Sequence, residues 1–284
     1  MSRALRGHFF FFCRQKLQIP GKNPFLALLT PPYYNGFVRP NQWEFQKGSV
    51  AVSTYTQELN GHLRYSRAVK RLIRKHLAAD FPPDRAEALW ADVHRIYLEF
   101  LTDLPALGGR KNMQAGSVYD CIALFAYYEA LPEKPTLAEF EHLNNELFLP
   151  PMKARSFLNL NWRFAPRAAH CIYALLARSI KKHAADWPGN YHMEVPPFDP
   201  ALGVRFHFTT CPIADFARKH GYTHLMPALC NPDYPMLAAL HGTLIRTTTC
   251  ANGDCCDYRI VGDQSPLARE HPLERDDAGY LRNR

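Results

Sequence analysis

The stretch Val204–Thr209, VRFHFT, decides the fold class, because the spacing of apolar residues changes there. Before it, apolar residues recur every three or four positions, as on one face of a helix, whereas from Val204 onward they alternate, as on a strand. Alternation continues in Leu244–Thr249 and Cys256–Val261, which flank Asn252 and Gly253, a turn pair typical of a β-hairpin in which the glycine adopts a positive φ. We therefore predict an α+β fold, with a helical N-terminal and middle part followed by a small antiparallel sheet with a C-terminal β-hairpin.

Helical spacing is clearest between His62 and His183. Thr136 is the predicted N-cap of one helix, with Glu139 as its capping-box partner. Gly221 is predicted to end a short helix that begins at Pro212. The remaining predicted helices have apolar stripes or compact hydrophobic runs: Tyr65–His76, Leu89–Phe100, Ser117–Leu131, Pro166–His183 and Pro235–Leu240.

The domain organisation follows from where this spacing begins and ends. Residues 1–60 are rich in Pro, Gly, Asn and aromatic residues and predict an extended N-terminal arm. Residues 61–262 show no internal repeat or low-complexity linker, so they predict a single α+β catalytic domain, with the most distinctive sequence block at 204–261. Residues 263–284 predict a charged, mobile tail.

Composition limits the class of protein. With 47% hydrophobic and 21% charged residues, the chain is globular rather than disordered. It has no apolar run long enough for a transmembrane helix, and Phe9–Phe12 is too short for a signal-peptide core. Eight cysteines without a secretion signal indicate free thiols and a cytoplasmic protein. The net charge of +8 fits an anionic small molecule, a membrane surface or nucleic acid.

The chemistry-bearing residues gather in the last third of the chain. They form four short motifs: Cys211-Pro212, Cys230-x-x-Asp233-Tyr234, Arg246-Thr247-Thr248-Thr249 and Cys255-Cys256-Asp257-Tyr258. Their order and spacing resemble the L-2-amino-thiazoline-4-carboxylic acid hydrolase family, as do, more weakly, Gly108-Gly109-x-x-Asn112 and residues 187–195. Cys250 departs from the family pattern, because an aliphatic residue is common at that position.

The resemblance implies a hydrolase for cyclic amidine carbon–nitrogen bonds, in small-molecule metabolism. Water would add at the ring carbon between sulfur and nitrogen, and the C–S bond would break. The implied catalytic residues are Cys211, Cys230, Asp233 and Cys256, which supply thiols and a carboxylate for nucleophilic or general-base work. The implied substrate-binding residues are Arg246, which would grip a substrate carboxylate, together with Thr249, His207 and Asn112.

Several alternatives stay open. The thiols could attack directly, or three of them could bind Zn²⁺ in a non-catalytic ligand sensor, although the spacing Cys211-x18-Cys230-x25-Cys256 lacks the paired knuckle of zinc sites. We expect no cofactor. Cysteines are also common core residues, and Asp233 could simply cap a helix. Expected partners are a small anionic heterocyclic substrate and no membrane; a homo-oligomer is compatible with the sequence. Nucleic-acid binding ranks last, since no groove-reading motif is present.

Overall fold

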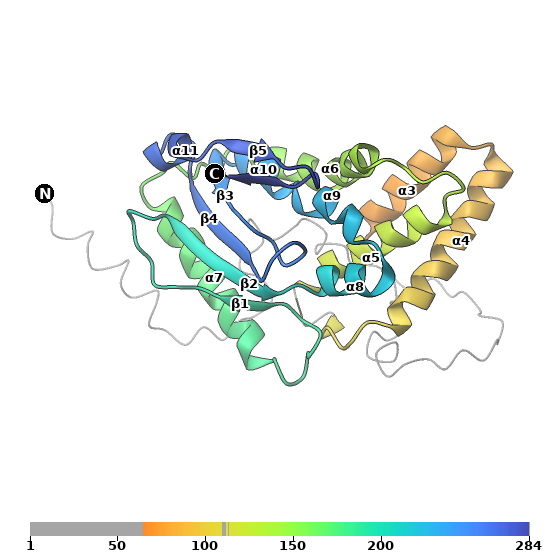
Figure 1. The fold of residues 1–284 in the computed structure, drawn as a ribbon, viewed down its shortest axis with the longest axis horizontal. Coiled ribbons are helices and arrows are strands. Elements are labelled where there is room, and N and C mark those ends of the chain that lie inside the picture. The colour runs from red at the N-terminus through yellow and green to blue at the C-terminus, as the bar shows by residue number, and fades with distance from the viewer. Residues whose placement is uncertain (1–64, 110–111, 113, 284) are drawn as a thin grey trace, which may run out of the picture. The chain divides into compact units, whose positions relative to one another are not determined.

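Helices precede the first strand in the part of the chain that the computed structural model describes, residues 65–109, 112 and 114–283 (Figure 1). The described residues all belong to one compact unit. The predicted arm, 1–60, lies outside the described residues. The helices that come before the sheet are α3 (Arg67–Asp80), α4 (Pro83–Thr102), α5 (Ala115–Ala130), α6 (Leu137–Lys153) and α7 (Ala165–Lys182).

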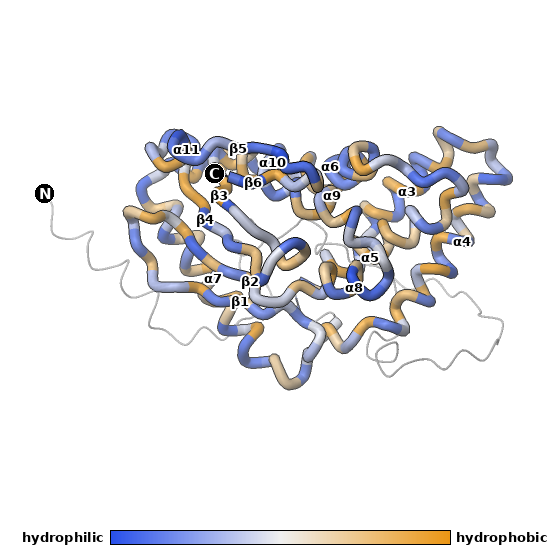
Figure 2. Tube along the Cα trace, viewed as in Figure 1, coloured by the Kyte–Doolittle hydropathy of each residue, from blue (hydrophilic) through white to orange (hydrophobic). Residues whose placement is uncertain are grey.

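The helices form where the apolar spacing and the capping residues predict them. Ser66 caps α3 by accepting the Val69 N–H at 3.2 Å. The capping box of α6 is confirmed: Thr136 and Glu139 bond reciprocally at its start. Polar and apolar segments alternate along α3 and α4, so one side of each helix faces the core (Figure 2).

Helix α5 lies at the centre of the larger hydrophobic cluster. Every residue from Val118 to Tyr127 is buried, including the carboxylate-bearing Asp120. Helices α3, α4 and α8 (Pro212–His220) pack against it. Burial of α5 on all sides explains why its sequence shows a hydrophobic run rather than a stripe.

The sheet is antiparallel throughout and has the order β1-β2-β4-β3, which confirms the α+β class. Its strands are β1 (His192–Glu194), β2 (Val204–Thr210), β3 (Gly242–Ile245) and β4 (Cys256–Gly262). Phe206 of β2 pairs with Tyr258 of β4, and their rings stack with centroids 4.6 Å apart. Helix α7 covers this face, where Tyr173 stacks on Phe206 at 4.2 Å.

Two details of the predicted hairpin are wrong. Strand β3 ends at Ile245 rather than at Thr249, because the N–H groups of Thr247 and Thr248 donate to the Asp257 carboxylate instead of to a neighbouring strand. Gly253 is not among the positive-φ glycines. A Cβ at this position would collide with the Thr248 hydroxyl, so close approach rather than φ requires glycine there.

The prediction of a mobile tail at 263–284 is also wrong. After β4 the chain forms α11 (Pro266–Glu270) and a hairpin of β5 (Leu273–Arg275) and β6 (Leu281–Asn283). The hairpin docks on the core because Asn283 exchanges hydrogen bonds with the Arg246 backbone, each 2.9 Å long. Charge density alone suggested solvent exposure, but the apolar Tyr280 and the polar Asn283 are both buried.

Three short helical segments connect β2 to β3 after α8. They are the 3₁₀-helix η3 (Thr223–Leu225), α9 (Met226–Cys230) and α10 (Asp233–Ala238). Among the described residues, no helix combines the length and apolarity that crossing a membrane requires.

Gly203→Ala is expected to destabilise the fold more than Gly221→Ala. Both glycines have a positive φ, of 75° and 79°. A Cβ at Gly203 would lie 2.5 Å from the Ile260 carbonyl oxygen, whereas one at Gly221 meets nothing within 4 Å. The left-handed conformation alone costs about 1 kcal/mol, and the clash adds to it. Thermal unfolding of the two variants measures the difference, and equal losses would contradict it.

Candidate active site

Cys211 lies at the junction of β2 and α8, as the N-cap residue of the helix. Burial raises the pKa of its thiol well above the usual value, and the Cys256 thiol adds to the rise. The backbone N–H groups of Ala214 and Ile213 oppose it, because they stabilise negative charge on the sulfur. Burial dominates, so this thiol is neutral at neutral pH.

Cys230 and Cys256 lie close to Cys211. Burial raises the pKa of Cys230 to about 12, although Arg246 and the Thr249 hydroxyl oppose the rise. The pKa of Cys256 rises further, because it donates a hydrogen bond to Cys250 and is buried. The Cys256 thiol raises the pKa of both Cys211 and Cys230, and the Cys230 thiol raises that of Cys211. The structure thus brings together the three cysteines that the sequence analysis selected.

Cys250 is a member of the cluster that the sequence analysis missed. Its N–H donates to the Cys256 sulfur at 3.2 Å, and its own thiol donates to the Phe208 carbonyl at 3.1 Å. Its pKa is lowered, because the Cys256 thiol hydrogen-bonds to it. The position of Cys250 on the loop opposite Cys256 could have indicated that it belongs to the cluster. It was not selected, because a cysteine at this position departs from the family pattern.

Asp233, Arg246 and Tyr258 form a second, charged cluster. The Asp233 Oδ2 accepts from Arg246 Nη1 at 2.8 Å and from the Tyr258 hydroxyl at 2.5 Å. The Tyr258 phenol donates because burial, together with the Asp233 charge, raises its pKa far above the usual value. The Asp233 side chain is 33% exposed, and among the described residues none donates a hydrogen bond to its Oδ1.

Arg246 is a buried charge rather than a surface residue. Its side chain is 1% exposed and lies between two aromatic rings, with its guanidinium carbon 5.0 Å from the Tyr234 centroid and 5.3 Å from that of Tyr258. Nη2 donates to the Cys230 carbonyl at 2.9 Å. In this structure Arg246 forms an ion pair with the Asp233 carboxylate, in the place where a substrate carboxylate was expected.

The other predicted substrate-binding residues are placed differently. Thr249 belongs to the thiol cluster, because its hydroxyl interacts with the Cys230 thiol. Asn252 fixes Thr249: the Asn252 Oδ1 accepts from the Thr249 N–H and from the Thr249 hydroxyl, each at 2.9 Å. His207 pairs with Asp257 in the sheet, so strand alternation puts it on the opposite face from Phe206 and Cys256. The Asn112 side chain donates a hydrogen bond to the backbone of its own loop, at the Leu107 carbonyl 2.6 Å away. The structure therefore does not bring His207 and Asn112 into the cluster.

Metal ligands are not grouped in the part of the chain that the structure describes: no set of three or more His, Cys, Asp or Glu side chains there is arranged to hold a metal ion. The seven described cysteines are all free thiols.

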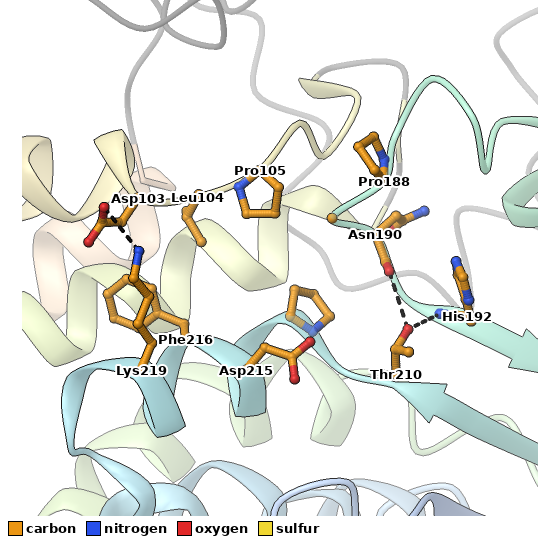
Figure 3. Close-up of a pocket in the computed structure, with 12 residues that line it drawn as sticks. Asp103, Leu104, Pro105, Pro188, Asn190, His192, Thr210, Asp215, Phe216 and Lys219 are labelled. Atoms are coloured by element: carbon orange, nitrogen blue, oxygen red, sulfur yellow. Dashed lines mark hydrogen bonds and ion pairs between the residues drawn. The ribbon is translucent and has the colours of Figure 1, made fainter.

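A cavity of about 220 Å³ opens beside the turn that carries Cys211 (Figure 3). Thr210 and Pro212 line it, together with residues 103–105, 188–190 and parts of α8. Neither Asp233 nor Arg246 contributes to its wall. The cavity and the charged cluster are therefore separate features.

Comparison with known proteins gives a single family. The sequence profile described as L-2-amino-thiazoline-4-carboxylic acid hydrolase matches residues 118–260, which include most of α5, most of the sheet and every cysteine of the cluster. No curated protein sequence and no solved structure matched the chain.

Proposed function

Because the chain belongs to the L-2-amino-thiazoline-4-carboxylic acid hydrolase family, we propose that it hydrolyses a small anionic cyclic amidine of this type. The substrate would be a 2-amino-thiazoline carboxylate or a related ring. Water adds to the carbon between the ring sulfur and nitrogen, and the C–S bond breaks. The product is the N-carbamoyl amino acid with a free thiol.

The observation that carries the proposal is the asymmetric binding of the Asp233 carboxylate. One oxygen is held by Arg246 and Tyr258, whereas the other has no donor among the described residues and the side chain is one third exposed. A carboxylate fixed at one oxygen and open at the other is suited to take a proton from water. In the proposal, Asp233 Oδ1 is the general base.

The state of the thiols supports water rather than sulfur as the nucleophile. A thiol with a pKa near 12, as at Cys230, is thiolate in about one molecule in 10⁵ at neutral pH. Burial raises the pKa of Cys211, and the hydrogen bond to Cys250, together with burial, raises that of Cys256, so both stay protonated at neutral pH. In the proposal these three neutral thiols contact the ring, where an S–H group can donate weakly to the leaving sulfur.

The proton and electron balance closes without a cofactor. Asp233 takes one proton from water as the oxygen bonds to the amidine carbon, and the C=N electron pair moves to the ring nitrogen. When the C–S bond breaks, its electron pair stays on sulfur, which takes the proton back from Asp233 to give the free thiol. The remaining hydroxyl proton passes to the ring nitrogen as the carbonyl forms. Arg246 is a positioning residue in this scheme, because its hydrogen bond to Oδ2, 2.8 Å long, fixes the orientation of the carboxylate.

Turnover in ¹⁸O-water tests the function. We expect the purified protein to open 2-amino-thiazoline-4-carboxylate, to release one small-molecule thiol per ring, and to place ¹⁸O in the carbamoyl group. The methyl ester of the substrate, which lacks the negative charge, is expected to be a poorer substrate. Mass spectrometry of the small-molecule fraction excludes signal from the protein's own thiols. A protein that leaves this ring and related cyclic amidines intact would overturn the proposed function.

A further inference from the structure

Cys250 lies in the loop between β3 and β4, in contact with Cys256, the first residue of β4. The Cys250 N–H donates to the Cys256 sulfur at 3.2 Å, and the two thiols are hydrogen-bonded to each other. Both residues are free thiols in this structure. A disulfide between them needs little movement, because the two side chains are already in contact.

The backbone around Cys250 is held in place from two sides. Arg218, on α8, donates from Nη1 to the Cys250 carbonyl at 2.6 Å. Within the loop, the Gly253 N–H donates to the Thr249 carbonyl at 2.8 Å. These hydrogen bonds fix the loop against α8, so the contact between the Cys250 and Cys256 side chains is built into the fold.

The two thiols differ in reactivity. The hydrogen bond between them lowers the pKa of Cys250 and raises that of Cys256, and burial raises the pKa of Cys256 further. Because the thiolate is the form of cysteine that attacks an oxidant, Cys250 is the thiol of this pair that reacts first. Cys256 is then the protonated second thiol, in contact with the oxidised sulfur.

The burial of the pair limits which oxidant can reach it. Cys250 is 5% exposed, and the loop residues Asn252, Gly253 and Asp254 next to it are exposed. Thiol oxidation depends on access to the sulfur as well as on the fraction of thiolate. Hydrogen peroxide is small enough for such a narrow approach, whereas a bulky disulfide such as oxidised glutathione requires the loop to open.

We propose that Cys250 and Cys256 are a peroxide-sensitive pair that closes to a reversible disulfide. The Cys250 thiolate attacks one oxygen of hydrogen peroxide, the O–O bond breaks, and the hydroxide that leaves takes up a proton to form water; the sulfur is now a sulfenic acid. The Cys256 sulfur then attacks the sulfenic sulfur. The S–S bond forms, the S–O bond breaks, and the leaving hydroxide takes the Cys256 thiol proton as a second water.

Peptide mapping of the folded full chain after peroxide treatment tests the pair. The treated protein is alkylated and digested with a protease that cleaves before aspartate, which places Cys250 on peptide 233–253 and both Cys255 and Cys256 on peptide 254–256. We expect the two peptides to be joined by a link that dithiothreitol reduces. Oxidised glutathione is expected to form the link about tenfold more slowly, because access limits it; an equal rate would overturn the preference for peroxide.

Cys255→Ala is the matched control, because Cys255 precedes Cys256 directly and is less buried. This variant is expected to keep the link, which then involves Cys256 alone, whereas Cys250→Ala is expected to lose it. Peroxide-treated protein in which Cys250 and Cys256 stay reduced, or a link that disappears in Cys255→Ala, would overturn the pair. The parent and Cys255→Ala decide the pairing even where Cys250→Ala does not fold.

The disulfide also removes the Cys256 S–H group from the thiol cluster. If the proposed function holds, on which this expectation rests, turnover of the cyclic amidine falls about tenfold in the oxidised protein and returns with dithiothreitol. Loss of the ring is measured by mass spectrometry, independently of the link. A link without a fall in turnover supports the disulfide and contradicts the contact of Cys256 with the ring, so the failure of one proposal is distinguishable from that of the other.

Discussion

Asp233→Asn is expected to lower kcat/KM for the cyclic amidine by about 10²–10⁴-fold, the range for loss of a general base. The amide cannot accept the proton that the attacking water releases. The variant keeps an oxygen for Tyr258 but leaves the buried Arg246 charge without its carboxylate, so its folding is checked by thermal unfolding. The rate is measured by release of the small-molecule thiol under conditions in which the variant is folded.

Tyr258→Phe and cysteine variants separate the possible roles. Tyr258→Phe keeps the carboxylate and removes one of its two donors, so it is expected to lose far less activity than Asp233→Asn. Cys230→Ala is expected to cost about tenfold, and Cys171→Ala, on α7 outside the cluster, close to nothing. A folded Asp233→Asn that stays within tenfold of the parent would contradict the general-base role. A covalent adduct trapped on Cys211, Cys230 or Cys256 would replace water with a thiolate as nucleophile.

Asp120 is expected to make stability depend strongly on pH. Burial raises its pKa from 3.8 to about 7, although the Ser66 N–H, at 2.7 Å, stabilises the charged form. Between these two values the folded protein keeps a proton that the unfolded chain loses, so the stability contributed by this group falls as pH rises and is flat above about 7. A shift of this size corresponds to about 4 kcal/mol in total.

Asp120→Asn removes that titration and keeps an acceptor for Ser66. The measured quantity is the difference in unfolding free energy between parent and variant, from urea denaturation at several pH values. We expect the variant to gain about 4 kcal/mol relative to the parent between pH 4 and pH 8, most of it below pH 7. Asp92→Asn, an exposed carboxylate on α4, is the control for loss of a charge. A difference that stays constant with pH would show that Asp120 is ionised throughout in the folded state.

The sequence predicted the elements whose formation depends on local patterns. Helix α6 follows from its capping box, and α8 from Pro212 at one end and Gly221 at the other. Strand β2 follows from alternation. These signals lie within a few residues of one another, so they can be found without knowledge of the tertiary structure.

The parts that the sequence did not predict depend on contacts between distant residues. The family resemblance implied that Arg246 binds a substrate carboxylate, yet its partners in the fold, Asp233 and Tyr258, come from α10 and β4. His207 was selected for its nearness in sequence to Cys211, but the pleat of β2 turns it to the other face.

The small C-terminal hairpin makes the structure of the charged cluster depend on the equilibrium between docked and open states of β5 and β6. Asn283 holds the Arg246 backbone at both its N–H and its carbonyl, and Tyr234 donates to the Leu281 carbonyl at 2.9 Å. Two strands of three residues each open more readily than a helical core, because few backbone hydrogen bonds hold them. The free energy of this local opening, rather than that of global unfolding, therefore determines how often the ion pair of Arg246 and Asp233 is out of place.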